Sequence, residues 1–541
     1  MTTQPTQSTD YDAIVIGAGP VGLYQLHLLR ERGLSVRTLE AGSGVGGAWY
    51  WNRYPGARLD SESYTYQYFF NQELLDEWSW SEEFVTQPEL ERYYNFVADK
   101  LDLRPSIDFD TRVVSTVFDE STHRWTLATE DGRAYTAKYV VAATGILSVP
   151  YTPAIEGLDS FQGRMLHTAV WPHEPQSFDG RRVAVIGTGS TGIQIIQALG
   201  PVVGELTVFQ RSANWATPLN NSPISAERMA ELRAAYPDIR DRTQSTSQCF
   251  NIESLTEGAL DVSEEERRAH FEKLWNMPGL VFLTHNFADV MINEEANDTV
   301  VAYLTEKIKQ RVNDPEVARK LIPDHRFGQK RPPLEVGYYE VFNQDNVELV
   351  NLGEEAILRV TATGIQTTER HLEFDDIILA TGFDALAGSF NKLGIVGSGG
   401  VALEDWWSDG PRTYLGLTVH HFPNLFMVGP QGVGGNFPAS AKGPVDWITQ
   451  TIADAESDGV ARIEATHSAE QEWVDMINAT LQITVLKDAQ SWITGHNIPG
   501  KVKTNFTAYL MPMFMYKDKL ASVRANGYEG FDRQASADAP S

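Results

Sequence analysis

Two glycine-rich turns in this chain have the G-x-G-x-x-G spacing of loops that hold a dinucleotide pyrophosphate. They read Gly17-Ala-Gly-Pro-Val-Gly22 and Gly187-Thr-Gly-Ser-Thr-Gly192. Glycines at these positions allow a tight strand-to-helix turn, close approach of backbone N–H groups to the pyrophosphate, and close packing of helix on strand. The chain is therefore predicted to hold two dinucleotides, which favours redox chemistry. The predicted contacts in the two turns are Gly17, Gly19, Gly22, Gly187, Thr188, Gly189, Ser190, Thr191 and Gly192.

The two predicted dinucleotide sites differ in the residue at the end of the strand that follows each glycine-rich turn. Glu40 lies about 20 residues after the first turn, where a carboxylate accepts hydrogen bonds from ribose hydroxyls and suits FAD or NAD. Arg211 holds the matching place after the second turn, between Gln210 and Ser212. A guanidinium there favours a 2′-phosphate through charge-assisted hydrogen bonds. We therefore predict an FAD site and an NADPH site, with a solvated surface arginine as the alternative interpretation of Arg211.

The elements around the turns predict an α/β fold with two Rossmann-like dinucleotide-binding domains. Apolar, β-branched runs at 11–16 and 182–186 precede the turns and are typical of buried parallel strands. Ala-Thr-Gly turns at 143–145 and 380–382 mark expected crossings between the domains. The expected parts are 1–150 (FAD domain, first part), 151–222 (NADP domain, first part), 223–326 (helical insertion in the NADP domain), 327–380 (NADP domain, second part) and 381–541 (FAD domain, C-terminal part).

Composition limits the possible partners and location. The net charge of −28 argues against nucleic-acid binding and against an anionic membrane surface, because either needs a basic face. The first ten residues lack a signal-peptide pattern, and no run approaches the roughly 18 apolar residues of a membrane-spanning helix. The lone Cys249 is consistent with a reducing cytoplasm and excludes a flavin disulfide reductase, which needs a cysteine pair. We expect a cytoplasmic protein with no obligate protein partner.

Metal chemistry finds little support in the sequence. The twelve histidines include the pair His420-His421, but no H-E-x-x-H or Cys/His ligand set accompanies them. We therefore expect no metal site.

Two longer motifs resemble the signatures of type I Baeyer–Villiger monooxygenases. Residues 161–172 match F-x-G-x-x-x-H-x-x-x-W-P, and residues 46–60 match G-G-x-W-x-x-x-x-Y-P-G-x-x-x-D. The resemblance extends from about Tyr11 to Gly530. Over this range the chain is similar to the cyclohexanone, steroid and other ketone monooxygenases of this class. It implies a flavin monooxygenase that uses NADPH and O2 to convert a ketone into an ester or lactone, through a C4a-peroxyflavin and a tetrahedral peroxy adduct.

The resemblance also implies which residues carry this reaction. Arg331, which follows Lys330, matches the cation that holds the peroxide as an anion and stabilises the developing alkoxide. Asp60 closes the second motif and matches the partner that orients this arginine; a helix cap is the alternative interpretation. His167 lies in the first motif, where a structural hinge between domains is a better interpretation than a general base.

The remaining cofactor contacts are likewise implied by the resemblance. Lys330 would join Arg211 and Ser212 around the 2′-phosphate, and Trp492 would close a mobile loop over the nicotinamide; a solvated lysine and a packing tryptophan are the alternatives. The further residues matched to the flavin are Ala48, Trp49, Tyr50, Trp51, Arg58, Asp60, Tyr66 and Val113. Packing alone is the alternative interpretation of Val113.

The resemblance also implies that the loop after the Gly-Pro turn at 429–430 lines the substrate pocket, and here that loop is nearly bare of side chains. It comprises Val433, Gly434, Gly435 and Phe437, and missing side chains leave volume for large cyclic or bicyclic ketones. Loop flexibility explains the glycines equally well. The alternative functions are an N- or S-oxygenating flavin monooxygenase and a non-catalytic FAD/NADP sensor, and sulfide oxidation is an expected side activity.

Overall fold

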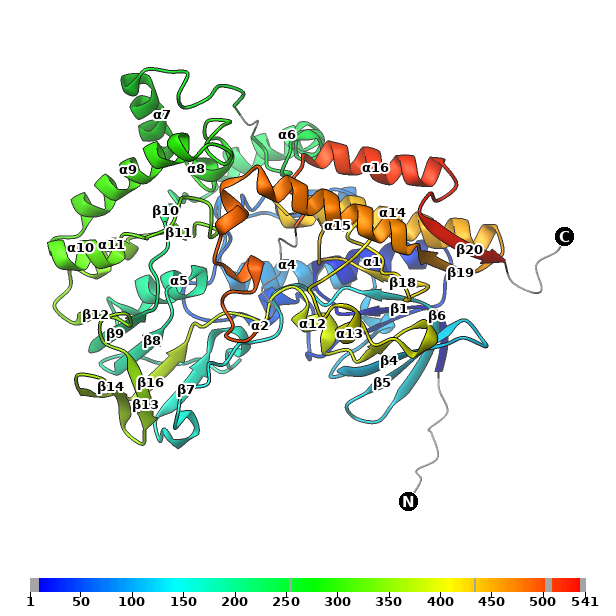
Figure 1. The fold of residues 1–541 in the computed structure, drawn as a ribbon, viewed down its shortest axis with the longest axis horizontal. Helices are drawn as coiled ribbons and strands as arrows, with labels where there is room; N and C mark the ends of the chain where they lie inside the picture. Colours follow the sequence, from blue (N-terminus) through cyan, green and yellow to red (C-terminus); the bar gives the residue numbers. More distant parts are fainter. Residues whose placement is uncertain (1–8, 253–254, 433, 502–507, 536–541) are drawn as a thin grey trace.

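The structure, a computed structural model, describes residues 9–252, 255–432, 434–501 and 508–535. Two α/β bodies lie side by side, each built around its own sheet (Figure 1). The first body contains the N-terminal and C-terminal parts of the chain, and the second contains the middle part. Both expected Rossmann-like domains are therefore present.

The first sheet has the strand order β17-β4-β5-β6-β1-β2-β3, with β18 also paired to β6. β1 runs parallel to β2 and to β6, while β4, β5 and β6 form an antiparallel meander. β17 and β18 come from the C-terminal part, so the chain returns to the first body after crossing the second. The strands are β1 Thr9–Ile16, β2 Val36–Leu39, β3 Ile107–Asp108, β4 Val113–Asp119, β5 Arg124–Thr129, β6 Ala134–Ala142, β17 Ile395–Val396 and β18 Leu425–Met427.

The continuous apolar run of β1 is explained by burial on both faces of this sheet. Ala13 and Val15 pack into one core, and Ile14 and Ile16 pack into the core on the other face. Successive side chains of a strand point to opposite faces, so a strand between two layers must be apolar throughout.

The second sheet is parallel and has the order β12-β9-β8-β16-β7. Val183 and Val185 of β8 face one core, whereas Ala184 and Ile186 face the other. A separate antiparallel sheet, β13-β14-β15, adjoins this body. The strands are β7 Arg164–His167, β8 Arg182–Ile186, β9 Glu205–Gln210, β12 Val347–Asn351, β13 Ile357–Thr361, β14 Gly364–Thr367, β15 His371–Glu373 and β16 Asp376–Leu379.

Helices cover both sheets (Figure 1). In the first body they are α1 Pro20–Glu31, α2 Ala48–Trp51, α3 Gln72–Glu77, α4 Gln87–Lys100, α12 Gly388–Asn391, α13 Leu403–Trp406, α14 Phe437–Ser457, α15 His467–Gln482 and α16 Met513–Ala525, with the hairpin of β19 Val460–Ala465 and β20 Phe531–Ala535. In the second body α5 Ser190–Leu199 and α11 Tyr338–Val341 flank the sheet, beside the two-stranded pair β10 Thr217–Pro218 and β11 Leu334–Glu335.

The segment 223–326 is helical, as its composition predicted, but its helices divide between the two bodies. α6 Ala226–Ser245 places Met229 and Leu232 in the core of the first body, against α14 and α16. The others pack on the second body; they are α7 Glu264–Asn276, α8 Val281–Thr284, α9 Glu294–Arg311 and α10 Pro315–Leu321. The expectation of one insertion within the NADP domain therefore differs from the structure at α6, because helical spacing does not reveal which core a helix covers.

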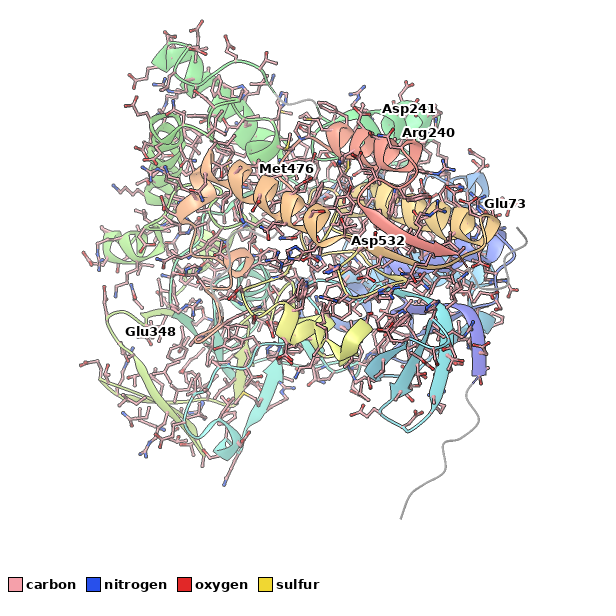
Figure 2. All side chains as sticks on the ribbon, turned by 45° about the vertical axis from the view of Figure 1, so that its right-hand side comes forward. Glu73, Arg240, Asp241, Glu348, Met476 and Asp532 are labelled. Carbon is pink, nitrogen blue, oxygen red and sulfur yellow. The ribbon has the colours of Figure 1, made fainter. Side chains whose placement is uncertain are left out.

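Acidic residues outnumber basic ones, at 72 against 44, and three of them that are exposed, Glu73, Asp241 and Asp532, are labelled in Figure 2. Among the helices of the described ranges, none combines the length and apolarity that crossing a membrane requires.

The two glycine turns have the same geometry. Gly17 and Gly187 adopt φ angles of 103° and 113°, a region that favours glycine. A Cβ on Gly22 would overlap the carbonyl oxygen of Gly17, and a Cβ on Gly192 would overlap that of Gly187. The third glycine of each motif therefore permits the close helix-strand packing that the spacing predicted.

Replacing Gly22 with alanine should prevent this packing in the first body. We expect the Gly22→Ala variant to lose bound FAD and about 1–3 kcal/mol of unfolding free energy, because the added methyl group forces helix α1 off the strand. Flavin absorbance after gel filtration and urea unfolding measure the two effects. The control is Gly443→Ala within α14, where the nearest atom is Lys517 Cγ at 3.9 Å from the added Cβ. Equal flavin content in both variants would contradict the assignment of the first turn.

Candidate active site

Arg331 and Asp60 meet at the junction of the two bodies. Arg331 Nη1 lies 2.5 Å from Asp60 Oδ2, and both side chains are about one-third exposed, at 34% and 29%. Burial disfavours the charged guanidinium, but the charge and hydrogen bond of Asp60 raise the pKa of Arg331 above its usual value. The structure thus brings together two residues that are far apart in the sequence and holds a permanent cation at this point.

Aromatic residues of the first body lie beside this ion pair. Trp49 Nε1 donates to the Tyr66 hydroxyl at 3.3 Å, with the two rings perpendicular and 6.0 Å apart. Burial raises the pKa of Tyr66, and the charges of Asp60 and Arg331 both act on that hydroxyl. Tyr66 therefore stays protonated beside the Asp60–Arg331 pair.

The other residues matched to the flavin lie in the same body. Ala48, Trp49, Tyr50 and Trp51 form the short helix α2, and the Tyr50 hydroxyl hydrogen-bonds to Ser43 Oγ at 2.7 Å. Val113 is buried at the start of β4.

Glu40 and Arg58 were also matched to the FAD site. In the structure both side chains interact with other groups of this chain. Glu40 accepts backbone hydrogen bonds from Ala18 at 2.6 Å and from Gly42 at 2.7 Å. Burial nevertheless raises the pKa of Glu40. Arg58 lies 3.7 Å from the Glu82 carboxylate.

Two cations gather beside the second glycine turn. Lys330 Nζ donates to Ser212 Oγ at 2.9 Å, and Thr188 Oγ1 donates to the Ser212 carbonyl at 3.0 Å. Burial lowers the pKa of Lys330; the charge of Asp324 offsets part of this effect, and the nearby charge of Arg211 lowers the pKa further. Within the part of the chain that the structure describes, neither Lys330 nor Arg211 forms an ion pair with a carboxylate. Two cations without a directly paired carboxylate, together with a hydroxyl, form a suitable receptor for a phosphate dianion.

Gln210, also predicted to contact the nucleotide, is buried, and its Nε2 donates to the Lys320 carbonyl at 2.7 Å. Its Oε1 has no hydrogen-bond partner among the described residues. The prediction that Gln210 contacts the cofactor stays a prediction.

Comparison with known proteins identifies the family of this site. The model of the pyridine nucleotide-disulphide oxidoreductase family matches residues 14–267. A Baeyer-Villiger monooxygenase of Pseudooceanicola batsensis is 42% identical over 98% of both chains. The chain belongs to the Baeyer–Villiger monooxygenases.

Two further relatives show the breadth of this similarity. The solved structure of an oxidized steroid monooxygenase bound to NADP is 45% identical, with a TM-score of 0.93, and the match covers 98% of this chain and all of that one. A phenazine N-monooxygenase of Lysobacter antibioticus is 41% identical over 97% of both chains. As a Baeyer–Villiger monooxygenase, the protein is an FAD-containing, NADPH-dependent enzyme.

The two turns of this monooxygenase fit its two dinucleotides. No atom lies within 4 Å of the position that a Cβ on Gly189 would occupy, so the turn before α5 leaves space for close approach of a phosphate. Ser190 and Thr191 follow as the first residues of that helix. FAD would be held by the turn before α1 and by α2, and NADPH by the turn before α5 with Arg211, Ser212 and Lys330.

The expected closing loop of the monooxygenase lies against the second body. Trp492 starts a short 3₁₀ helix, Trp492–Thr494, capped by Ser491. Arg211 Nη1 donates to the Asn497 carbonyl at 3.4 Å, and Asn497 Nδ2 donates to the Phe383 carbonyl at 2.9 Å. The loop therefore contacts Arg211, and closure of Trp492 over the nicotinamide stays a prediction.

The expected substrate loop precedes α14. Val433 lies outside the described residues. A Cβ on Gly434 would meet no atom within 4 Å, whereas Gly435 has a φ of 109° and packs against the Gln248 carbonyl. Phe437 is the first residue of α14 and packs against the core of the first body.

His167 is the last residue of β7 in the second sheet, and its ring contacts backbone groups on both sides. Its Nδ1 accepts from the Ala169 N–H at 3.1 Å, and its Nε2 lies 3.2 Å from the Tyr151 carbonyl oxygen. Both ring nitrogens contact the backbone, and the role of His167 as a structural hinge stays a prediction.

Two polar residues at the site were missed by sequence reasoning. Gln194 on α5 bonds to the loop that carries Asp60. Asn436 is fully buried and donates to Thr65 Oγ1 at 2.9 Å, which ties the substrate loop to the first body. The available signals were the glutamine following the second turn and the asparagine directly before the helix that starts at Phe437.

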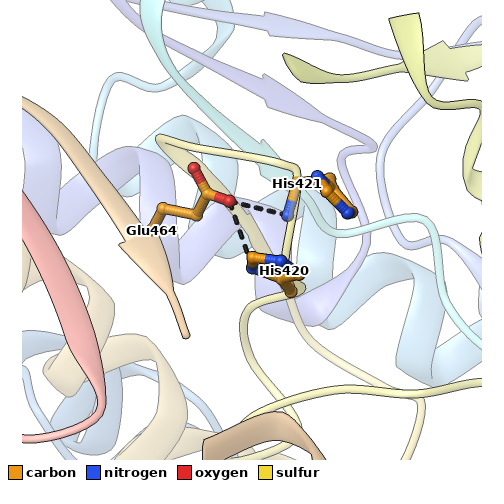
Figure 3. A group of neighbouring side chains, drawn as sticks. All are labelled: His420, His421 and Glu464. Atoms are coloured by element: carbon orange, nitrogen blue, oxygen red, sulfur yellow. Dashed lines mark hydrogen bonds and ion pairs between the residues drawn. The ribbon is translucent and has the colours of Figure 1, made fainter. Parts of the chain in front are cut away.

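A group of potential metal ligands lies apart from this site. His420, His421 and Glu464 each offer an atom within 4.8 Å of the others (Figure 3). Glu464 Oε1 accepts from the His421 backbone N–H at 2.8 Å and lies 3.2 Å from His420 Nδ1, and its other oxygen pairs with Arg462. The carboxylate that a metal would need is thus already satisfied by a cation and an N–H group. Glu464 comes from β19, so its approach to the histidine pair was not visible in the sequence.

Proposed function

We propose that this monooxygenase inserts one oxygen atom from O2 next to the carbonyl of cyclic ketones, bulky ones included, and releases an ester or lactone. The observation that carries the proposal is the Asp60–Arg331 ion pair at the junction of the two nucleotide-binding bodies. An oxygenase that attacks a carbonyl must stabilise negative charge on the former carbonyl oxygen, and a fixed guanidinium supplies that stabilisation. Small-molecule ketone, O2 and NADPH are the only partners that the proposal requires.

Each residue of the site has a defined task in this proposal. The reduced flavin, when bound, supplies the two electrons that activate O2. Arg331 stabilises the negative oxygen that forms when the carbonyl is attacked, and its raised pKa keeps it charged throughout the working range of pH. Asp60 orients Arg331, while Lys330, Arg211 and Ser212 select NADPH by its 2′-phosphate. A cytoplasmic location is proposed from the lone, buried Cys249.

The bare substrate loop supports the proposed acceptance of bulky ketones. Gly434 faces open space, so a large side chain there would fill volume without disturbing the backbone. We expect Gly434→Leu to lower kcat/KM for a bicyclic ketone roughly tenfold and to leave that for cyclohexanone unchanged, because only the larger substrate would clash. Gly434→Ala is the matched control. Equal losses for both ketones would contradict the assignment of this loop to the pocket.

N-oxygenation is the second candidate function, and the phenazine N-monooxygenase relative supports it. A nitrogen heterocycle or thioether accepts oxygen at a lone pair and forms no negative carbonyl oxygen, so Arg331 would not be needed for that purpose. Incubation of the enzyme, NADPH and O2 with a ketone, a thioether and an aromatic N-heterocycle separates the candidates. Ester or lactone as the main product supports the ketone reaction, and N-oxide with unchanged ketone supports the alternative.

A further inference from the structure

Helix α5 binds both segments that carry the Asp60–Arg331 pair. The Tyr54 hydroxyl donates to Gln194 Oε1 at 2.7 Å, and Gln194 Nε2 donates to the Arg58 carbonyl at 3.2 Å. One turn further along, Gln197 Oε1 accepts from the Val336 N–H at 2.7 Å. The helix therefore holds the chain just before Asp60 through Gln194 and the chain just after Arg331 through Gln197.

The loop before Asp60 is seated tightly on this helix. Tyr54 and Ala57 come from the first body in sequence but are buried in the core of the second, at 8% and 4% exposure. Gly56, with a φ of 86°, lies so close that a Cβ on it would overlap the backbone oxygen of Gln194. A displacement of α5 must consequently displace the loop.

The same helix begins at the turn assigned to the NADP pyrophosphate. Thr191, Gln194 and Ala198 follow one another at helical spacing, so they share the face that contacts the loop. Burial raises the pKa of Tyr54 to about 12. The Tyr54 hydroxyl thus remains protonated and keeps donating to Gln194.

We propose that Gln194 is a positioning residue that couples occupancy of the NADP turn to the placement of Asp60 and Arg331. A nucleotide bound at the start of α5 fixes the helix, and the Gln194 side chain transmits that constraint to the Tyr54–Arg58 loop. Both ends of its amide are engaged within the protein, so its effect passes through the loop and not through a contact with the nucleotide. The inference rests on the role proposed above for Arg331.

The test measures how NADP+ changes the outcome of one oxidation of the reduced enzyme. Enzyme with chemically reduced FAD is mixed with O2 and ketone, with or without NADP+, and the products are quantified as lactone against hydrogen peroxide. Wild type should give more lactone when NADP+ is bound. In Gln194→Met, which keeps side-chain length but removes both hydrogen bonds, this gain should fall roughly fivefold. The Kd for NADP+ should stay unchanged.

A second variant keeps the test decisive if Gln194→Met folds poorly. Tyr54→Phe removes only the 2.7 Å hydrogen bond and should reduce the NADP+ gain in the same direction. In the double variant the two effects should not add, because both act through one contact. Gln310→Met, on the exposed surface of α9, is the matched control and should behave as wild type.

Three results would overturn the coupling. The first is a wild-type lactone yield that does not respond to NADP+, and the second is an undiminished response in Gln194→Met. The third is a Gln194→Met variant that binds NADP+ more weakly but shows the full response once saturated with it. The Arg331→Met variant distinguishes a failure of the coupling through Gln194 from a failure of the proposed function. If that variant still forms lactone, the role of Arg331 is wrong; if it forms none while Gln194→Met responds normally, only the coupling is wrong.

Discussion

Replacing Arg331 with methionine is expected to lower lactone formation by about two to three orders of magnitude while NADPH oxidation continues. The variant keeps an unbranched side chain, shorter than that of arginine, but removes the cation that stabilises the negative oxygen. Reducing equivalents should then leave as hydrogen peroxide, because Arg331 is assigned to the attack on the ketone and not to binding of the 2′-phosphate. Product analysis by gas chromatography together with a peroxide assay measures both effects.

The matched control for this variant is Arg326→Met. Arg326 lies close in sequence but pairs with Glu294 at 2.9 Å, outside the Asp60–Arg331 site. Asp60→Asn should give a smaller loss than Arg331→Met, because the cation remains but is less well oriented. Lactone formation at the wild-type rate in Arg331→Met would remove the basis of the proposed reaction.

Replacing Arg211 with alanine is expected to raise KM for NADPH roughly 10- to 100-fold and to leave KM for NADH unchanged. The guanidinium is assigned to the 2′-phosphate, which NADH lacks. Steady-state kinetics with both cofactors measure the difference. Arg319→Ala on the surface of α10, where Arg319 pairs with Glu354 at 2.9 Å, is the control. A parallel loss with NADH would show that Arg211 supports the fold and not phosphate selection.

The pH dependence of NADPH binding provides an independent check on Lys330. Its pKa is lowered by burial and by Arg211, so its charge is lost at lower pH than that of an ordinary lysine. The kcat/KM for NADPH should therefore fall as the pH rises through this lowered pKa, and the fall should be absent in Lys330→Met. The profile with NADH should show no such difference between the two proteins.

Local sequence signals predicted the parts of the fold that depend on short-range geometry. The turns at Gly17 and Gly187 were recognisable because their geometry depends on glycine itself, and the apolar runs before them because strands between two layers alternate between two cores. The placement of α6 was not predictable, since an amphipathic helix shows that it covers a core but not which one.

The site was predictable only in part. The resemblance to the family pointed to Asp60 and Arg331, and the structure brings them together as an ion pair. Gln194 and Asn436 escaped notice because a single polar residue has no periodicity and gains a role only from distant partners. The position of Glu464 beside His420 likewise depends on how β19 meets the loop, which is a property of the tertiary structure.

The most direct test of the central claim is the fate of isotopically labelled dioxygen. Purified enzyme with bound FAD is supplied with NADPH, labelled O2 and a cyclic ketone in unlabelled water, and the product is analysed by mass spectrometry. The proposed reaction predicts a lactone that carries one labelled oxygen in the ring. Unchanged ketone with labelled hydrogen peroxide as the only product, or a lactone without the label, would contradict it.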